Sequence, residues 1–380
     1  MVKLLEDVCD VYSGYALKSF NESEDGLPVI KIGNITSDGY MNLLKCDYST
    51  EKVSEKYYSQ LGDIYVALSG ATTGKIGIMT TGERHIINQR VGIVRKTDKN
   101  IPDSFIKYFL LGKTERILHE AAGAAQPNIS PKQISKYQFP ELSVEEMTNI
   151  SIILDEITKL INSQKQELSL LDELIKARFV ELFENAPTKT VEEVCDSFKI
   201  GPFGSALHKN EISKEGYAFV LGTDNAVKNK FAYDEIRYID EAKYHELEKY
   251  KVNPEEIIMS MMGTVGRVSI IPEDIGNAII SSHLCILRVN KKFMIPEFFH
   301  CAFCEDDNIQ FQIDGIHNGS IMKGFNLKIV KAFEIKCPEI DKQKEFLQFK
   351  KQLDKSKYVC QKKIKLYQEL LDTKMNEYFN

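Results

Sequence analysis

The stretch of this chain that most resembles a site for chemistry is a glycine-bounded turn from Gly70 to Lys75. A phosphate-binding loop has the form G-x4-G-K-[ST], in which the hydroxyl contacts magnesium. The turn is one residue too short for that pattern, and Ile76 occupies the hydroxyl position. Its counterpart later in the chain carries Arg267 instead of the lysine. The pattern therefore argues against nucleotide binding and favours a turn between two strands.

Cysteine and histidine residues offer the next possible chemistry. Cys301 and Cys304 form a CxxC pair beside His300, but no second pair lies at zinc-binding spacing. We favour buried, reduced thiols, because the eight cysteines show no disulfide framework. The seven histidines form no HxxxH motif and no Ser–His–Asp order. No G-x-G-x-x-G follows a predicted strand, so the sequence lacks the recognisable parts of an enzyme.

Two polar triplets interrupt the apolar alternations of the two halves. Asn88, Gln89 and Arg90 interrupt an apolar alternation over 86–95, and residues 281–283 (Ser-Ser-His) interrupt the matching alternation over 279–288.

The elements that must position these residues occur twice. Each half contains a short opening element, a buried strand that feeds a loop, a strand–turn–strand unit, the polar triplet, a short apolar helix, a further loop and a closing strand. The paired segments are 5–10 with 191–196, 28–35 with 218–225, 62–79 with 255–271, 86–95 with 279–288, 102–105 with 296–299, 123–130 with 315–324, and 139–142 with 337–340. Such self-similarity indicates an internal duplication. Similar frames with different loops suggest two sites that read different things.

A heptad pattern predicts a long helix over 147–183 that recurs 196 residues later and ends at the C-terminus. The apolar positions alternate in steps of four and three, which is the seam of a helix that packs along another helix. The predicted seam residues are Ile150, Leu154, Ile157, Ile161, Leu168, Leu171, Ile175, Leu353, Ile364, Tyr367 and Leu371. Polar side chains interrupt the seam at Gln164, Arg178 and Lys374, and we expect them to fix the register or to mark where partners bind.

The charges of the two helices favour their pairing with each other. Residues 141–185 hold four Lys and Arg against ten Asp and Glu, whereas 340–380 hold ten against six. Opposite charges beside a seam attract each other, although both faces could instead be merely solvated. We expect an α/β (α+β) fold with two globular domains and two long helices that pair with each other. The predicted boundaries are 1–142, 143–185, 186–340 and 341–380.

The whole chain resembles the specificity (S) subunit of type I restriction–modification systems. The resemblance rests on residues 170–183 (LLDELIKARFVELF), their copy at the C-terminus, 126–130 (QPNIS) and 62–70 (GDIYVALSG). It implies two target-recognition domains that each read one half of a bipartite, asymmetric site on double-stranded DNA. The two long helices would pair as an antiparallel coiled coil with pseudo-twofold symmetry and act as a spacer. In one departure, Gln126, Pro127 and Asn128 are replaced by Asn318, Gly319 and Ser320 in the second half.

The resemblance also implies partners and cofactors. Two methyltransferase (M) subunits would dock on the helices and methylate adenine with S-adenosylmethionine, and motor-nuclease (R) subunits would use ATP and Mg. This chain itself would hold no cofactor, perform no catalysis and serve defence against foreign DNA in the prokaryotic cytoplasm. No apolar stretch is long enough for a membrane span.

Given this resemblance, residues in the turns and triplets are the candidates for DNA binding, because Asn and Gln can bind adenine with two hydrogen bonds and Arg can bind guanine in the same way. The alternative interpretation is that each is an ordinary residue of a turn or a strand end. The candidates are Ser69, Thr72, Thr73, Lys75, Asn88, Gln89, Arg90, Gln126 and Asn128 in the first half, and Lys209, Thr264, Arg267, Ser281, Ser282, His283, Asn318 and Lys323 in the second. The net charge of −6 predicts weak DNA binding by this chain alone, with partner subunits neutralising many phosphates. Two other classes stay open: a scaffold whose helices only dock proteins, and a self-sufficient DNA methyltransferase or nuclease.

Overall fold

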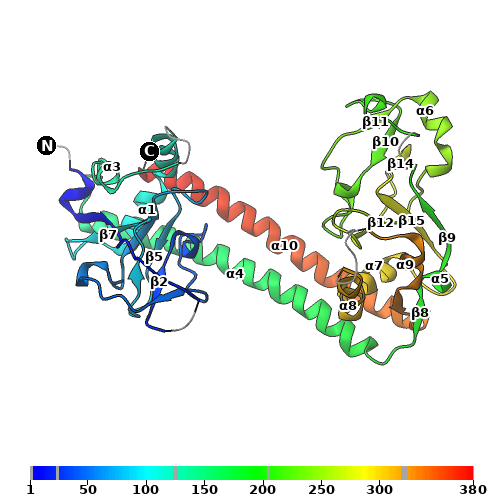
Figure 1. Ribbon diagram of the computed structural model, residues 1–380, viewed down its shortest axis with the longest axis horizontal. Helices are drawn as coiled ribbons and strands as arrows, with labels where there is room; N and C mark the ends of the chain where they lie inside the picture. The colour runs from blue at the N-terminus through cyan, green and yellow to red at the C-terminus, as the bar shows by residue number, and fades with distance from the viewer. Residues whose placement is uncertain (1–2, 23–24, 123–126, 203–205, 318–323, 380) are drawn as a thin grey trace. The chain divides into compact units, whose positions relative to one another are not determined.

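The computed structural model describes residues 3–22, 25–122, 127–202, 206–317 and 324–379. The chain forms two compact units. The first comprises Met1–Lys165 with Gln361–Asn380, and the second comprises Gln166–Cys360. The boundary falls inside two long helices, α4 (Val144–Phe183) and α10 (Ile340–Phe379), so each unit contains part of both helices (Figure 1).

The first unit contains a four-stranded antiparallel sheet and a three-stranded mixed sheet. The larger sheet has the order β1 (Cys9–Ser13), β7 (Val91–Lys96), β4 (Ile64–Ala67) and β5 (Ile76–Ile78). The smaller sheet has the order β3 (Asp47–Ser49), β2 (Leu27–Ile30) and β6 (Ile86–Ile87). Strands β2 and β6 run parallel, with Val29 opposite Ile86.

The second unit repeats both sheets strand for strand. The larger sheet has the order β13 (Val268–Ile270), β12 (Ile257–Ser260), β15 (Leu284–Val289) and β9 (Cys195–Ile200). The smaller sheet has the order β11 (Tyr238–Ile239), β10 (Ala218–Leu221) and β14 (Ala278–Ile280), again with its last pair parallel. The duplicated α/β architecture predicted from the sequence is therefore confirmed.

Short helices surround the sheets in both units. In the first unit they are α1 (Asp103–Leu111), α2 (Thr114–Ala121) and α3 (Pro131–Ser135). In the second they are α5 (Val191–Val194), α6 (Glu241–Glu246), α7 (Pro296–Glu305), α8 (Asp307–His317) and α9 (Leu327–Ala332). The sequence predicts only α1 and α7, each of which follows a Pro-Asp or Pro-Glu start.

Strand β4 separates two hydrophobic cores because its side chains alternate between its two faces. Ile64 and Val66 pack in one core with Phe105 of α1. Tyr65 and Ala67 pack in the other core, formed with the smaller sheet. Every residue of β4 is buried, which explains why the strand reads as a continuous apolar run.

Helices α4 and α10 each contain 40 residues, a length of about 60 Å. In the first unit the C-terminal end of α10 closes the core, since the Phe379 ring lies 5.5 Å from that of Phe105 (Figure 1). In the second unit Phe346 of α10 lies 5.5 Å from Phe179 of α4. The ion pair between Lys357 and Asp172 joins the same two helices. The predicted antiparallel pairing of the long helices is confirmed.

The predicted seam follows the buried stripe of both helices. None of the seam side chains is exposed, and Leu154, Ile157, Ile161 and Ile175 are fully buried. The polar seam residue Arg178 is half-buried, 3.8 Å from Glu345 across the seam. A charge on a seam is tolerated here because a partner carboxylate meets it.

The predicted closing strands at 139–142 and 337–340 are wrong in position. The second unit has a short strand, β16 (Glu334–Lys336), which ends just before the predicted segment 337–340. It pairs with β8 (Thr188–Thr190). In the first unit the corresponding contact is a single bridge between Leu4 and Gln138. Both predicted segments contain a proline, which cannot donate a ladder hydrogen bond.

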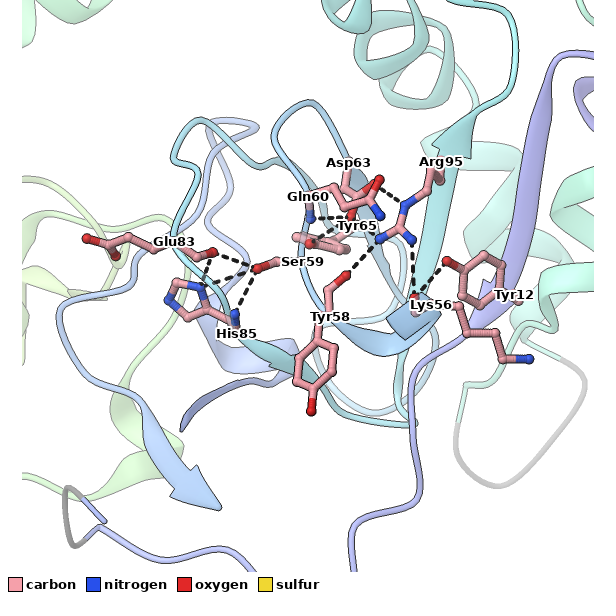
Figure 2. A network of polar contacts seen from close by, with 10 residues as sticks. All are labelled: Tyr12, Lys56, Tyr58, Ser59, Gln60, Asp63, Tyr65, Glu83, His85 and Arg95. Carbon is pink, nitrogen blue, oxygen red and sulfur yellow. Dashed lines mark hydrogen bonds and ion pairs between the residues drawn. The ribbon is translucent and has the colours of Figure 1, made fainter. Parts of the chain in front are cut away.

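A polar network braces the larger sheet of the first unit (Figure 2). Arg95 on β7 binds both carboxylate oxygens of Asp63, and its Nη2 also donates to the Tyr58 carbonyl at 2.8 Å. The Tyr12 hydroxyl donates to the Lys56 carbonyl at 2.8 Å. The network therefore fastens the segment before β4 to the edge strand β1 and to its neighbour β7.

Candidate nucleic-acid interface

Both polar triplets form the tight connection between the two sheets of their unit. Residues 88–90 join β6 to β7, and residues 281–283 join β14 to β15. A glycine presses against each triplet: a side chain at Gly14 would begin 2.4 Å from the Asn88 carbonyl oxygen, and one at Gly201 would begin 1.9 Å from that of Ser281. Only glycine allows so close a backbone approach, and the contact fixes where each triplet lies.

Two loops, the β4–β5 turn and residues 127–129, meet the triplet of the first unit. With the triplet they form a three-loop surface. The Leu68 amide donates to the Arg90 carbonyl at 2.9 Å, which ties the β4–β5 turn to the triplet. The Ile129 amide donates to the Leu68 carbonyl at 2.9 Å, and Ser69 forms a bridge with Asn128. The structure therefore brings three sequence-predicted residues, Ser69, Arg90 and Asn128, onto one surface.

The second unit repeats this convergence with other side chains. The Met261 amide donates to the His283 carbonyl at 2.8 Å, and the Phe325 amide donates to the Met261 carbonyl at 2.8 Å. Met262 forms a bridge with Gly324, as Ser69 does with Asn128. The scaffold is thus the same and the displayed side chains differ.

The candidates differ in how exposed their side chains are. Gln89, Arg90, Asn128, Lys209, Thr264 and His283 are exposed, whereas Ser69, Thr72, Lys75, Arg267, Ser281 and Ser282 are half-buried. Within the part of the chain that the structure describes, the side chains of Gln89 and Arg90 make no hydrogen bond. Their donors are free for bases or phosphates. Gln126, Asn318 and Lys323 lie outside the described residues.

Two candidates need correction. Thr73 is buried, and its hydroxyl donates to the Gly70 carbonyl at 2.7 Å. Asn88 is also buried, and its Oδ1 accepts from the Arg90 amide at 3.1 Å. Both side chains shape their own turns, as short polar residues commonly do, so we assign them to the scaffold of the surface.

A cavity of about 600 Å³ adjoins the triplet of the second unit. It is lined by four sequence-predicted residues, Lys209, Ser281, Ser282 and His283. Arg237 also lines it, and sequence reasoning missed this residue because it lies far from any recognised turn. The Arg237 guanidinium is held by Asp224 and, at 3.0 Å, by Glu235, so it presents a fixed planar donor at the edge of the surface.

Two buried asparagines, Asn34 and Asn225, hold the loops that follow β2 and β10. Asn34 accepts from the Lys31 amide at 2.8 Å, and Asn225 accepts from the Gly222 amide at 2.7 Å. Both also donate through Nδ2 to carbonyls of the following loop, at 2.9 Å to Lys45 and 2.6 Å to Ala232. Asn34 and Asn225 lie at the same distance after the ends of β2 and β10. This shared spacing is the signal in the sequence that could have found them.

The cysteines give no sign of a reactive or metal-binding centre. Burial raises the pKa of the Cys301 thiol to about 12, so it stays protonated near neutral pH. His300 donates to the Asn229 carbonyl at 2.8 Å. No cluster of His, Cys, Asp or Glu suited to a metal ion occurs among the described residues.

Comparison with protein families identifies the chain. The family model described as "Type I restriction modification DNA specificity domain" matches residues 1–172 and again residues 184–368. The chain belongs to this family. Members of the type I specificity family are the non-catalytic DNA-recognition components of their systems, and the twofold match agrees with the two units described above.

Individual relatives support this placement. The chain is 21% identical to the type I restriction enzyme EcoBI specificity subunit of Escherichia coli, over 92% of this chain and 78% of that protein. The S subunit of a type I system from M. genitalium shares its fold with a TM-score of 0.56 at 16% identity, over 100% of this chain and 95% of that one. A chain from a structural study of complex assembly and conformational transition of the type I R-M system shares the fold with a TM-score of 0.60. The two are 12% identical in sequence, over 100% of this chain and 97% of that one. Within the described residues, no helix of this specificity-family chain is long and apolar enough to cross a membrane.

Proposed function

We propose that each unit of this specificity subunit reads one half of a bipartite, asymmetric DNA site. The observation that carries the proposal is the three-loop surface, which recurs on the same scaffold with different exposed side chains. Arg90 in the first unit is matched by His283 in the second, and Ser69 by Met262. A shared frame with unlike reading residues is what two unlike half-sites require.

The exposed side chains have the chemistry of base recognition. Arg90 can bind O6 and N7 of guanine, and Gln89 can bind N6 and N7 of adenine. Lys209 and Thr264 suit phosphate contacts, which set position without reading sequence. With a net charge of −6, the chain alone neutralises few phosphates, so we expect tight binding only in the assembled complex.

The long helices serve as the spacer and as the docking surface for two methyltransferase subunits. The motif copied between the helices exposes one apolar pair on each unit: Leu170 and Leu174 are 54% and 46% exposed, and Leu366 and Leu370 are 61% and 42% exposed. Repeated exposed leucines on a paired helix suit a helical partner. The partners would bring S-adenosylmethionine, and motor-nuclease subunits would bring ATP and Mg, in the cytoplasm.

Methylome sequencing tests the proposal directly. Deleting the gene should abolish adenine methylation at one bipartite motif, and restoring it should recover that motif. Arg90→Ala should relax only the half-site read by the first unit, and His283→Ala only the other. One base contact discriminates by about 10- to 100-fold, which methylated fractions report readily. If no motif depends on the gene, or if Arg90→Ala alters both half-sites, the proposal fails.

A further inference from the structure

We infer that Met262 reads the 5-methyl group of a thymine in the half-site of the second unit. The inference rests on the proposed function and adds a residue that determines specificity together with the chemical group it recognises. The geometry of the β12–β13 turn carries it.

The turn holds Met262 in a fixed place on the reading surface. Its neighbour Met261 is 3% exposed and is fastened on both sides, to the His283 carbonyl and by the Phe325 amide, each at 2.8 Å. Met262 itself is bridged to Gly324 and is 52% exposed. The Ser260 hydroxyl accepts from the Arg267 amide at 2.9 Å and so closes the base of the turn. An apolar side chain therefore projects from a braced backbone.

The two units differ at this turn. Among the described residues, no atom lies within 4 Å of where a side chain at Gly263, the residue after Met262, would begin. At the corresponding Gly70 of the first unit, Ile32 lies 3.6 Å from that point. The first unit also places the polar Ser69 where the second places Met262. An exposed apolar side chain at this position is thus a property of the second unit's turn.

Exposure alone would not single out Met262, because isolated apolar residues are common on protein surfaces. Its position does, since it lies one residue from the backbone contact that joins the turn to the polar triplet. On a surface that faces the major groove, thymine offers the one apolar group of the four bases, its methyl. A flexible thioether packs well against such a small group.

A methyl-deletion experiment tests the inference on the complex of this chain with its methyltransferase subunits. Once the half-sites are known from the methylome, each thymine of the second half-site is replaced in turn by deoxyuridine, which lacks only the methyl group. We expect one position at which this replacement weakens binding about fourfold, the effect of one buried methyl. Met262→Ala should abolish the difference between thymine and deoxyuridine, and Met262→Leu should retain it.

Ser69→Ala, at the matching position of the first unit, is the control and should leave sensitivity in the second half-site unchanged. The inference is overturned if that half-site contains no thymine, or if deoxyuridine is tolerated throughout. It is also overturned if Met262→Ala weakens binding to thymine and deoxyuridine duplexes by the same factor. The variant would then still distinguish the two bases as well as the wild type does. In these cases the bipartite motif still depends on the gene, whereas failure of the proposed function would leave no such motif.

Discussion

The guanidinium of Arg95 engages both oxygens of the Asp63 carboxylate, with Nε 2.7 Å from Oδ1 and Nη2 2.6 Å from Oδ2. The Asp63 side chain is 2% exposed and that of Arg95 is 15% exposed. Arg288 and Glu256 form the corresponding pair in the second unit. The duplication has therefore retained the ion pair, with the aspartate of one unit replaced by a glutamate in the other and the second arginine 40% exposed.

Replacing Asp63 by Asn should destabilise the first unit. The change leaves the Arg95 charge in a mostly buried site without its anion, and breaking a buried pair in this way costs about 3–5 kcal/mol. Urea unfolding monitored in the first unit would measure the loss. Glu55→Gln is the control, because Glu55 pairs with Arg84 at the surface and its side chain is 83% exposed. Equal losses of stability from Asp63→Asn and Glu55→Gln would contradict this prediction.

The close approach of Gly201 to Ser281 predicts a selective defect. Gly201→Ala would place a methyl 1.9 Å from a carbonyl oxygen, so the backbone that carries the triplet must move. We expect methylation to lose fidelity in the half-site of the second unit, with lower stability of that unit. Gly82→Ala is the control, since no atom of the described residues lies within 4 Å of the added methyl. Wild-type methylation by Gly201→Ala would show that the triplet does not need this contact.

Phe379, at the end of α10, should contribute to the stability of the first unit. Its ring lies between those of Phe105 and Phe109, at 5.5 and 6.3 Å, and is 6% exposed. Phe379→Ala should cost about 3–5 kcal/mol, as large-to-small changes of buried aromatics do. Phe311→Ala, at a side chain that is 77% exposed, should leave the thermal midpoint nearly unchanged.

The largely buried His300 predicts a pH dependence of stability. Burial lowers the pKa of its imidazole below the ordinary 6.5, and nearby Lys350 acts in the same direction. The unfolded chain therefore takes up the proton first as the pH falls. The stabilising contribution is complete above about pH 6.5 and is lost as the pH decreases below it, by at most about 1.4 kcal/mol per pH unit.

Unfolding measured at pH 7.5 and at 5.5 would test this expectation. His300→Gln retains a donor for the Asn229 carbonyl but does not titrate, so its stability should change less between the two pH values. His245→Gln, at a side chain that is 60% exposed, should keep the wild-type difference. Identical pH profiles for wild type and His300→Gln would show that this imidazole is not responsible.

The repeated leucines predict a stoichiometric effect. Leu366→Lys with Leu370→Lys places two charges in one proposed docking patch, and it should reduce the methyltransferase subunits bound from two to one. Native mass spectrometry of the mixed subunits would count them. Leu44→Lys, at a residue that is 94% exposed outside the helices, should leave two bound, and two subunits on the Leu366/Leu370 variant would refute the assignment.

Sequence periodicity was sufficient to predict the long helices, because a heptad seam requires a partner and the second copy supplies it. The matching strand blocks were equally predictable, since Ile64 to Ala67 and Ile257 to Ser260 are apolar runs bounded by turns. What the sequence could not supply was contact across long separations. Nothing near Arg95 indicates that Asp63, 32 residues away, would be its partner.

The candidate surface was predicted in outline and corrected in detail. The turns and triplets do meet, but residue type alone could not separate exposed Gln89 from buried Asn88, two neighbouring amides. Met262 was missed because an apolar residue within a turn resembles core. Asn34 and Asn225 were missed because their hydrogen bonds connect backbone groups that only the folded loops bring together.

The placement of α10 has a consequence for the order of events during synthesis. Lys113 and the Phe379 carbonyl that it contacts are 266 residues apart, so the first unit cannot finish its core until the last turn of α10 has left the ribosome. The second unit, built from the continuous segment Gln166–Cys360, can close earlier. Domains usually complete in the order in which they emerge. Here the unit whose synthesis begins first completes its core last. A chain truncated before the end of α10 would leave the aromatic core of the first unit exposed to water.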